Sequence, residues 1–252
     1  MTVSLSAEEC ARYARQIKLP EIGEAGQVKL KQSSVLVVGT GGLGSPLAFY
    51  LAAAGIGRLG LVDSDRVERS NLQRQILHTT PRLGEMKVDS AYEQLFALNP
   101  EIRIERFAER FIDSQAENIA RGYDVIADGS DNFETRYAIN RYCAAAGRPY
   151  VYGAVFHYEG QVSVFDISRG PCYACLYPNE LENVKGIAQL DNGILGATAG
   201  VVGSMQALEV IKLLLGIGEG LVGRLILFDG LDMSTQVVKI ARNPSCPVCG
   251  SR

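Results

Sequence analysis

A glycine-rich segment, GTGGLG (39–44), has the spacing G-x-G-x-x-G. It ends an apolar run rich in β-branched residues (34–39) and opens a segment typical of a helix. In this context glycine lets the backbone approach a phosphate, and the free N–H groups at the helix start bind the anion. The alternative is a tight turn without a ligand. The pattern predicts a nucleotide-phosphate site at Gly39, Gly41 and Gly42.

A carboxylate, Asp63, follows the loop by about twenty residues, at the end of a second apolar run (58–63). There it can accept hydrogen bonds from the ribose hydroxyls of NAD or ATP equally well. The loop and Asp63 alone favour an NAD-dependent oxidoreductase. The polar stretch DSDRVERSNLQRQ (63–75) weakens that interpretation, because a hydride site has little use for dense polar groups. Further candidate binding residues in this stretch are Asp65, Asn71, Arg74 and Gln75.

Triphosphate chemistry does need such groups. Arg74 and Lys87 can neutralise charge on the phosphates. Asp131, in the sequence SDN after an apolar run that ends at Asp128, can hold Mg²⁺. The alternative for Arg74 and Lys87 is a solvated charged face. For Asp131 it is a helix N-cap with Glu134 at the third helical position. Together these residues provide the parts of an ATP and Mg²⁺ site.

Four of the six cysteines form two C-x-x-C pairs, Cys172 with Cys175 and Cys246 with Cys249. Two such knuckles supply the four thiolates that tetrahedral Zn²⁺ requires. With all four positions filled by protein, the metal would be structural. The alternative is two reduced or redox-active pairs.

The remaining cysteines and both histidines lack a partner in the sequence that would suggest catalysis or metal binding. Cys10 and Cys143 fall in expected helices and are interpreted as packing residues. His78 and His157 show no triad or ligand spacing, so a structural role is favoured for both.

The composition is that of an ordinary globular protein, with 252 residues, 47% hydrophobic, 21% charged and a net charge of −3. It excludes disorder, collagen and coiled coil, and gives no electrostatic reason to expect binding to nucleic acid or anionic membranes. The first residues do not resemble a secretory signal. Without such a signal we expect a cytoplasmic location. The most apolar stretch (199–218) carries Glu209 and Lys212, so we expect a buried helix and no membrane span.

Strands and helices alternate along the first part of the chain. A capping box, Ser6 with Glu9, predicts a short opening helix that carries Arg12 and Arg15. Strands are expected at 34–39, 58–63, 102–107, 123–129 and 149–154, and helices at 43–55, 84–98, 114–121 and 132–146. After that we expect a strand at 161–167, a helix at 198–215 and strands at 224–230 and 235–241. This pattern predicts an α/β fold with a doubly wound, Rossmann-like, mainly parallel sheet, extended by antiparallel C-terminal strands.

Seven motifs occur in one order: RYARQ (12–16), GTGGLGS (39–45), DSDRVERSNLQRQ (63–75), GEMK (84–87), SDN (130–132), CYACL (172–176) and NPSCPVCG (243–250). Together they resemble the ThiF/MoeB/HesA family of sulfur-carrier adenylyltransferases, relatives of the ubiquitin-activating enzymes. The resemblance covers residues 8 to 250 and implies one adenylation domain (1–252). Its nucleotide-binding half would be 1–154, and its carrier-binding and zinc half 155–252.

The resemblance also implies residue roles. Gly41 would lie against the phosphates and Asp63 would bind the ribose. Asn71, Arg74 and Lys87 would contact the triphosphate, and Asp131 would hold Mg²⁺. Arg15, the second arginine of the RYARQ motif, would reach into the ATP site of a partner subunit, which implies a homodimer.

The implied reaction joins ATP to the C-terminal Gly-Gly of a small ubiquitin-fold carrier of the ThiS or MoaD type. The carboxylate attacks the α-phosphate, pyrophosphate leaves and an acyl-adenylate forms. A separate sulfurtransferase or cysteine desulfurase would then deliver sulfur. Thiamine, molybdopterin, thio-tRNA and secondary-metabolite pathways all fit, since the site residues recognise ATP. The alternatives are a noncatalytic module that docks carrier and nucleotide and, weakest, the oxidoreductase.

One departure concerns a cysteine that many members carry after the first knuckle. This chain has none between Cys175 and Cys246, and Gln189 falls near the expected position. We therefore predict adenylation without a persulfide or thioester to this chain. Residues 177–195 are expected to form a mobile crossover loop above the carrier's tail.

Overall fold

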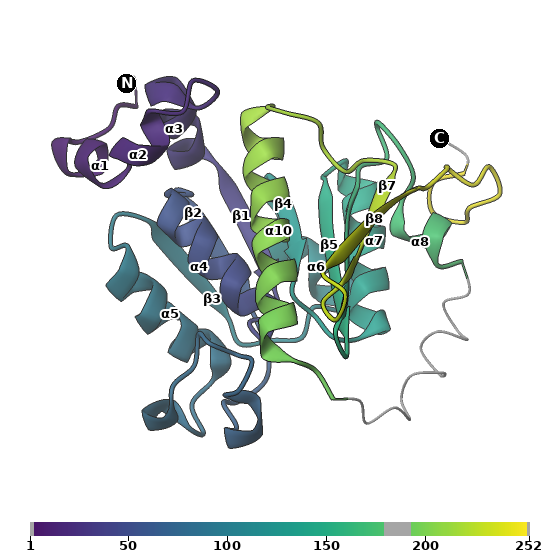
Figure 1. Cartoon of the computed structure of the whole chain (residues 1–252), viewed down its shortest axis with the longest axis horizontal. Coiled ribbons are helices and arrows are strands. Elements are labelled where there is room, and N and C mark those ends of the chain that lie inside the picture. The colour runs from purple at the N-terminus through teal and green to yellow at the C-terminus, as the bar shows by residue number, and fades with distance from the viewer. Residues whose placement is uncertain (1–2, 179–192, 251–252) are drawn as a thin grey trace.

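The structure, a computed structural model, describes residues 3–178 and 193–250. Its centre is an eight-stranded sheet with the strand order β3-β2-β1-β4-β5-β6-β7-β8 (Figure 1). The first five strands are parallel: β1 (Ser34–Val38), β2 (Arg58–Val62), β3 (Arg103–Phe107), β4 (Val125–Asp128) and β5 (Tyr150–Phe156). The predicted doubly wound, mainly parallel sheet is confirmed.

The last three strands are antiparallel, as the sequence predicted. They are β6 (Glu159–Phe165), β7 (Arg224–Asp229) and β8 (Ser234–Lys239). The β5–β6 hairpin turns at His157, which has a positive φ. Because β5 runs parallel to β1 and β4, this hairpin and the turn between β7 and β8 lie at the edge of the sheet where the parallel strands end.

Helices cover both faces of the sheet. One face packs against α3 (Gly23–Gln32), α4 (Gly44–Ala54), α5 (Lys87–Leu98) and α10 (Gly196–Leu215). The other packs against α6 (Asp113–Ala120), α7 (Phe133–Ala146) and α8 (Tyr173–Leu176). Short 3-10 helices η1 (Arg69–Asn71) and η2 (Thr80–Arg82) lie between β2 and α5. Helices on both faces explain why β1 and β4 are buried along their whole length.

The apolar stretch near residue 200 forms α10, which packs along α4 and over β5 and β6 (Figure 1). Within the described residues it is the one helix long and apolar enough to cross a membrane, but half of its most apolar window is buried inside the protein. Gln206 and Glu209, both buried, point to a packed core helix. The expectation of a buried helix therefore agrees with the structure.

The N-terminal region corrects one prediction. The capping box is present, with Glu9 N donating to Ser6 Oγ and Ser6 N to Glu9 Oε2. The single expected helix is instead two, α1 (Ala7–Arg12) and α2 (Ala14–Ile17), so Arg12 and Arg15 lie on different helices. The helix is interrupted at Tyr13. This residue is buried, and its hydroxyl accepts a hydrogen bond from Asn99.

Candidate functional site

The glycine loop joins β1 to α4 through very close backbone contacts. Gly39 has φ +90°, a left-handed conformation that favours glycine. A Cβ at Gly44 would lie 1.9 Å from the carbonyl oxygen of Gly39, and one at Gly39 would lie 2.7 Å from the Gly129 backbone. These two glycines are therefore required for the strand, the loop and the helix to pack together.

Gly41 and Gly42 face the polar segment instead. A Cβ at Gly41 would come 3.4 Å from Gln75 Nε2, and one at Gly42 would come 3.5 Å from Arg74 Cγ. Gln75 is buried, and its Oε1 has no hydrogen-bond partner among the described residues. The structure thus brings Arg74 and Gln75, two of the candidate binding residues, against the loop.

Asp63 holds the loop through Thr40. Its Oδ2 accepts hydrogen bonds from the Thr40 backbone N–H, at 2.8 Å, and from the Thr40 hydroxyl, at 3.0 Å. Its Oδ1 accepts the backbone N–H of Asp65 at 2.9 Å. A carboxylate oxygen has two acceptor sites, so Oδ1 retains capacity for a ribose hydroxyl.

Lys87 begins α5 and reaches back to the end of β2. Its Nζ lies 2.8 Å from Asp65 Oδ2, and its backbone N–H donates to the Asp65 carbonyl at 2.9 Å. The Lys87 side chain is 7% exposed, whereas that of Asp65 is 64% exposed. The pair is therefore open to a ligand on the carboxylate side. Asn71, in η1, is half-buried, and its carbonyl accepts the Arg74 backbone N–H at 3.1 Å.

Asp131 follows β4 by three residues and is exposed. The N-cap alternative is wrong, because Asn132 caps α7 and its side chain accepts the Thr135 backbone N–H at 2.9 Å. The neighbouring Asp128 is fully buried and accepts from Ser130 N and Oγ and from the Tyr150 hydroxyl. Asp128 thus anchors the turn from which Asp131 projects.

The buried Asp128 faces a buried arginine. Arg136 Nε lies 3.8 Å from Asp128 Oδ2, and Arg136 Nη2 donates to the Ser130 carbonyl at 3.2 Å. Burial raises the pKa of Asp128, and the Arg136 charge and the hydrogen bonds from Ser130 and Tyr150 oppose that rise. Sequence reasoning missed this pair, because nothing in the spacing indicates that Arg136 turns back toward the strand.

Arg15 is not brought to the loop within one chain. It lies exposed on α2, whose neighbouring residue Gln16 donates to the carbonyl of Ala54, the last residue of α4. The loop lies at the other end of α4 (Figure 1). A helix of 11 residues spans about 16 Å, so Arg15 lies about one helix length from the loop.

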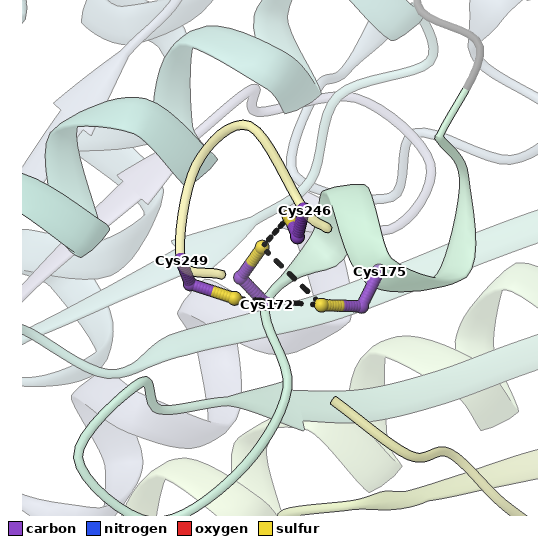
Figure 2. Close-up of side chains that lie close together, drawn as sticks. All are labelled: Cys172, Cys175, Cys246 and Cys249. Carbon is purple, nitrogen blue, oxygen red and sulfur yellow. Dashed lines mark hydrogen bonds between the residues drawn. The ribbon is translucent and has the colours of Figure 1, made fainter. Parts of the chain in front are cut away.

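The four predicted zinc ligands form one cluster (Figure 2). All four Sγ atoms lie within 4.8 Å of one another. The shortest approaches run between the two knuckles, 3.4 Å from Cys175 to Cys249 and 3.5 Å from Cys172 to Cys246, whereas Cys172 and Cys175 are 3.9 Å apart. The knuckles interleave, so the alternative of two separate redox pairs is disfavoured.

The sulfur spacing fits the ion. Tetrahedral coordination with Zn–S bonds of about 2.3 Å places the sulfurs about 3.8 Å apart. The backbone N–H of Asn243 donates to Cys175 Sγ at 3.4 Å, and Asn140 Nδ2 lies 3.8 Å from Cys172 Sγ. Such contacts orient thiolate ligands. The cluster is therefore compatible with a closed structural zinc site that ties the C-terminal loop to α8.

His78 is a buried polar residue for which the sequence analysis favoured a structural role. Its ring contacts Thr40 in the glycine loop and Ser90 in α5, each at 3.0 Å. Burial lowers its pKa, with a further contribution from the charge of Lys87, while the hydrogen bond to Thr40 and the charge of Asp63 oppose the shift. The partners lie 38 and 12 residues away along the chain, so no local spacing reveals them.

A glycine loop at the start of a helix, with acidic and basic side chains around it, defines an α/β nucleotide-binding protein. The chain belongs to the ThiF family, which it matches over residues 13–248. It is 47% identical to the sulfur carrier protein adenylyltransferase of Thermus thermophilus, covering 96% of this chain and 92% of that protein.

Two further proteins are similar to this chain over nearly its whole length. The chain is 48% identical to the adenylyltransferase and sulfurtransferase MOCS3 of Bos taurus, covering 99% of this chain and 55% of that protein. It therefore spans about half the length of that relative. The crystal structure of E. coli MccB with ATP has a TM-score of 0.83 at 26% identity, covering 95% of this chain and 74% of that one.

Proposed function

We propose that this protein adenylates the C-terminal Gly-Gly carboxylate of a small ubiquitin-fold sulfur-carrier protein, giving an acyl-adenylate and pyrophosphate. The observation that carries the proposal is the 47% identity to the Thermus thermophilus sulfur carrier protein adenylyltransferase over 92% of its length. The arrangement of side chains around the glycine loop supports it, because it supplies the contacts that a triphosphate needs.

The chemistry suits a site without a general base. A C-terminal carboxylate is ionised at neutral pH, so it attacks the α-phosphorus directly as the bond to pyrophosphate breaks. Catalysis then rests on positioning and on neutralising phosphate charge. In our assignment the loop holds the phosphates, Asp63 the ribose, and Asp65, Asn71, Arg74, Gln75 and Lys87 complete the nucleotide site.

Asp131 fits a role in holding Mg²⁺. Its carboxylate is exposed and is not used as the cap of α7, a position that Asn132 fills. Carboxylate oxygens are the ligands that Mg²⁺ prefers, and the ion would neutralise the leaving pyrophosphate. A second observation concerns Gln75, which lies next to Gly41 and whose buried Oε1 has no hydrogen-bond partner among the described residues. Because a buried acceptor normally has a donor, this atom supports a polar ligand at the glycine loop.

An exposed apolar surface at the same edge of the sheet supports the carrier as partner. It comprises Phe156, Tyr158, Leu195, Leu231 and Met233. Backbone hydrogen bonds from Gly230 N to Tyr158 O and from Leu195 N to His157 O hold its three segments together. We assign this surface to docking the carrier body, with its tail running to the loop. Gln189 and most of the expected crossover loop (177–195) lie outside the described residues.

A second copy of the chain is the partner we propose for an apolar groove between α4 and α10. Its volume is about 530 Å³, and Tyr50 and Leu208, which line it, are 57% and 61% exposed. Exposed apolar area of this kind marks interfaces. In such a homodimer Arg15 would reach the ATP site of the partner subunit, since it lies about one helix length from the glycine loop of its own chain.

Zinc and the sulfur source complete the proposal. Zn²⁺ at the four cysteines would be structural, because the protein fills every coordination position. The unpaired thiols fit a reducing compartment such as the cytoplasm. We assign sulfur delivery to a sulfurtransferase or cysteine desulfurase, because the MOCS3 relatives are named as sulfurtransferases as well as adenylyltransferases.

Mass spectrometry of the carrier after incubation with enzyme and MgATP tests the function. The proposal predicts a carrier heavier by one adenylyl group, and none when ATP is replaced by NAD. Binding of carrier and MgATP without that product would favour the noncatalytic docking module instead.

A further inference from the structure

His78 occupies a position between two parts of the nucleotide site. It is 4% exposed and follows the polar segment that carries Arg74. On one side its Nε2 lies 3.0 Å from the carbonyl oxygen of Thr40, and on the other its Nδ1 lies 3.0 Å from the hydroxyl of Ser90. Thr40 and Ser90 are both fully buried, so neither contact exchanges with water.

These contacts define the tautomer. A carbonyl oxygen only accepts, so Nε2 must carry the proton that it donates to Thr40. Burial lowers the pKa of His78 and the nearby Lys87 charge adds to this, while the hydrogen bond to Thr40 and the Asp63 charge oppose it; the net lowering favours the neutral ring at pH 7. In the neutral ring Nδ1 is then an acceptor, and the Ser90 hydroxyl donates to it.

The same residues close a ring of hydrogen bonds. Thr40 N donates to Asp63 Oδ2, and Asp65 N donates to Asp63 Oδ1. Lys87 N donates to the Asp65 carbonyl and Lys87 Nζ to its carboxylate. Ser90 lies about one turn after Lys87 in α5. His78 contacts both Ser90 and Thr40 and so completes the ring.

We propose that His78 is a positioning residue: its neutral ring, protonated on Nε2, closes this hydrogen-bonded ring and fixes the glycine loop relative to Lys87. The inference rests on the proposed function, since it assumes that loop and lysine hold one nucleotide. His78 links the loop to α5 on one side of the ring, and Asp63 with Asp65 links them on the other.

Two isosteric variants separate the two contacts. Asn places an amide oxygen one bond from Cγ, as Nδ1 is, so it can accept from Ser90, and Gln places an amide nitrogen two bonds from Cγ, as Nε2 is, so it can donate to Thr40. His78→Asn therefore keeps a partner for Ser90 and loses Thr40, whereas His78→Gln keeps Thr40 and loses Ser90. Ser90→Ala removes the second contact independently. Ser163→Ala is the matched control, because Ser163 is a fully buried serine whose hydroxyl donates to the Arg224 carbonyl in another part of the sheet.

Steady-state pyrophosphate exchange and titration of MgATP measure the effect. We expect His78→Asn to raise the KM and Kd for ATP about tenfold, with the KM for carrier unchanged. His78→Gln and Ser90→Ala should give a smaller rise of the same kind. Ser163→Ala should lower the melting temperature without changing the KM for ATP, which separates positioning from a merely structural role.

Nitrogen NMR of protein labelled at histidine gives a second readout, since the chain has only 2 histidines. The proposal predicts a signal with Nε2 protonated and Nδ1 unprotonated at pH 7, which disappears in His78→Asn. An Nδ1-protonated His78, or an unchanged Kd and KM for ATP in both folded His78 variants, would overturn it. Wild-type protein that binds MgATP but shows no exchange with any carrier would contradict the proposed function instead, while the Kd values and the spectrum still decide the role of His78.

Discussion

Lys87 Nζ and Asp65 Oδ2 lie 2.8 Å apart, with the lysine buried and the carboxylate largely exposed. A buried ammonium needs a partner, and Asp65 provides one at the end of β2. Because the carboxylate side is open, phosphate oxygens can approach the same ammonium. In the proposed function this lysine supplies a cation for the triphosphate.

Replacing Lys87 should remove this cation without unfolding the protein. We expect Lys87→Ala to lower kcat/KM for ATP on the order of a hundredfold in pyrophosphate exchange. Lys31→Ala is the matched control, since Lys31 pairs with the buried Glu9 at 2.7 Å on the N-terminal helices. That control should lower the melting temperature but leave exchange intact. Equal activity losses in the two variants would contradict the role of Lys87.

Asp131 and Asn132 are neighbours with separable roles. Asp131→Ala should abolish exchange while the melting temperature stays near that of the wild type, because the helix cap is retained. Asn132→Ala should lower the free energy of unfolding by about 1 kcal/mol, because α7 loses its N-cap. Chemical denaturation and exchange assays on both variants check this. The assignment fails if Asp131→Ala keeps Mg²⁺-dependent exchange.

Zinc should be stoichiometric and structural. We expect one Zn²⁺ per chain by elemental analysis, and its loss in Cys172→Ser together with a lower melting temperature. Cys10→Ser is the control, because Cys10 lies outside the cluster. Retention of zinc by Cys172→Ser, or loss in the control, would disprove the ligand assignment.

A shared site predicts complementation between inactive chains. Arg15→Ala and Asp131→Ala should each be inactive alone, but mixed after subunit exchange they should recover roughly a quarter of wild-type activity. Half of the dimers formed at random are mixed, and one of the two sites in each is intact. Proven exchange of subunits without recovered activity would rule out an Arg15 that acts in the partner's site.

The alternation of strands and helices could be predicted because each buried strand is a short apolar run ended by glycine or a polar residue. The helix expected at 84–98 begins instead at Lys87, since Gly84 has a left-handed conformation and Met86 is extended. The interruption at Tyr13 was not predicted; the buried Tyr13 hydroxyl accepts a hydrogen bond from Asn99, 86 residues away, a contact that the local sequence does not indicate.

Some features of the candidate site could likewise be predicted from the sequence, and others could not. The cysteine quartet follows from spacing alone, because each knuckle is local and only the pairing of the two is distant. The sequence SDN offers two adjacent capping residues, and only the structure shows that Asn132, not Asp131, caps α7. The position of His78 depends on three segments that meet only in the fold, so no pattern around it indicates its contacts.

Carrier-dependent exchange of labelled pyrophosphate into ATP tests the central claim most directly. A panel of ubiquitin-fold carriers ending in Gly-Gly would be assayed with wild-type protein and Asp131→Ala. We predict exchange with at least one carrier, dependent on Mg²⁺ and on the free C-terminal carboxylate, and abolished in the variant. Absence of exchange with every carrier, although MgATP and a carrier both bind, would contradict adenylation and favour a docking module.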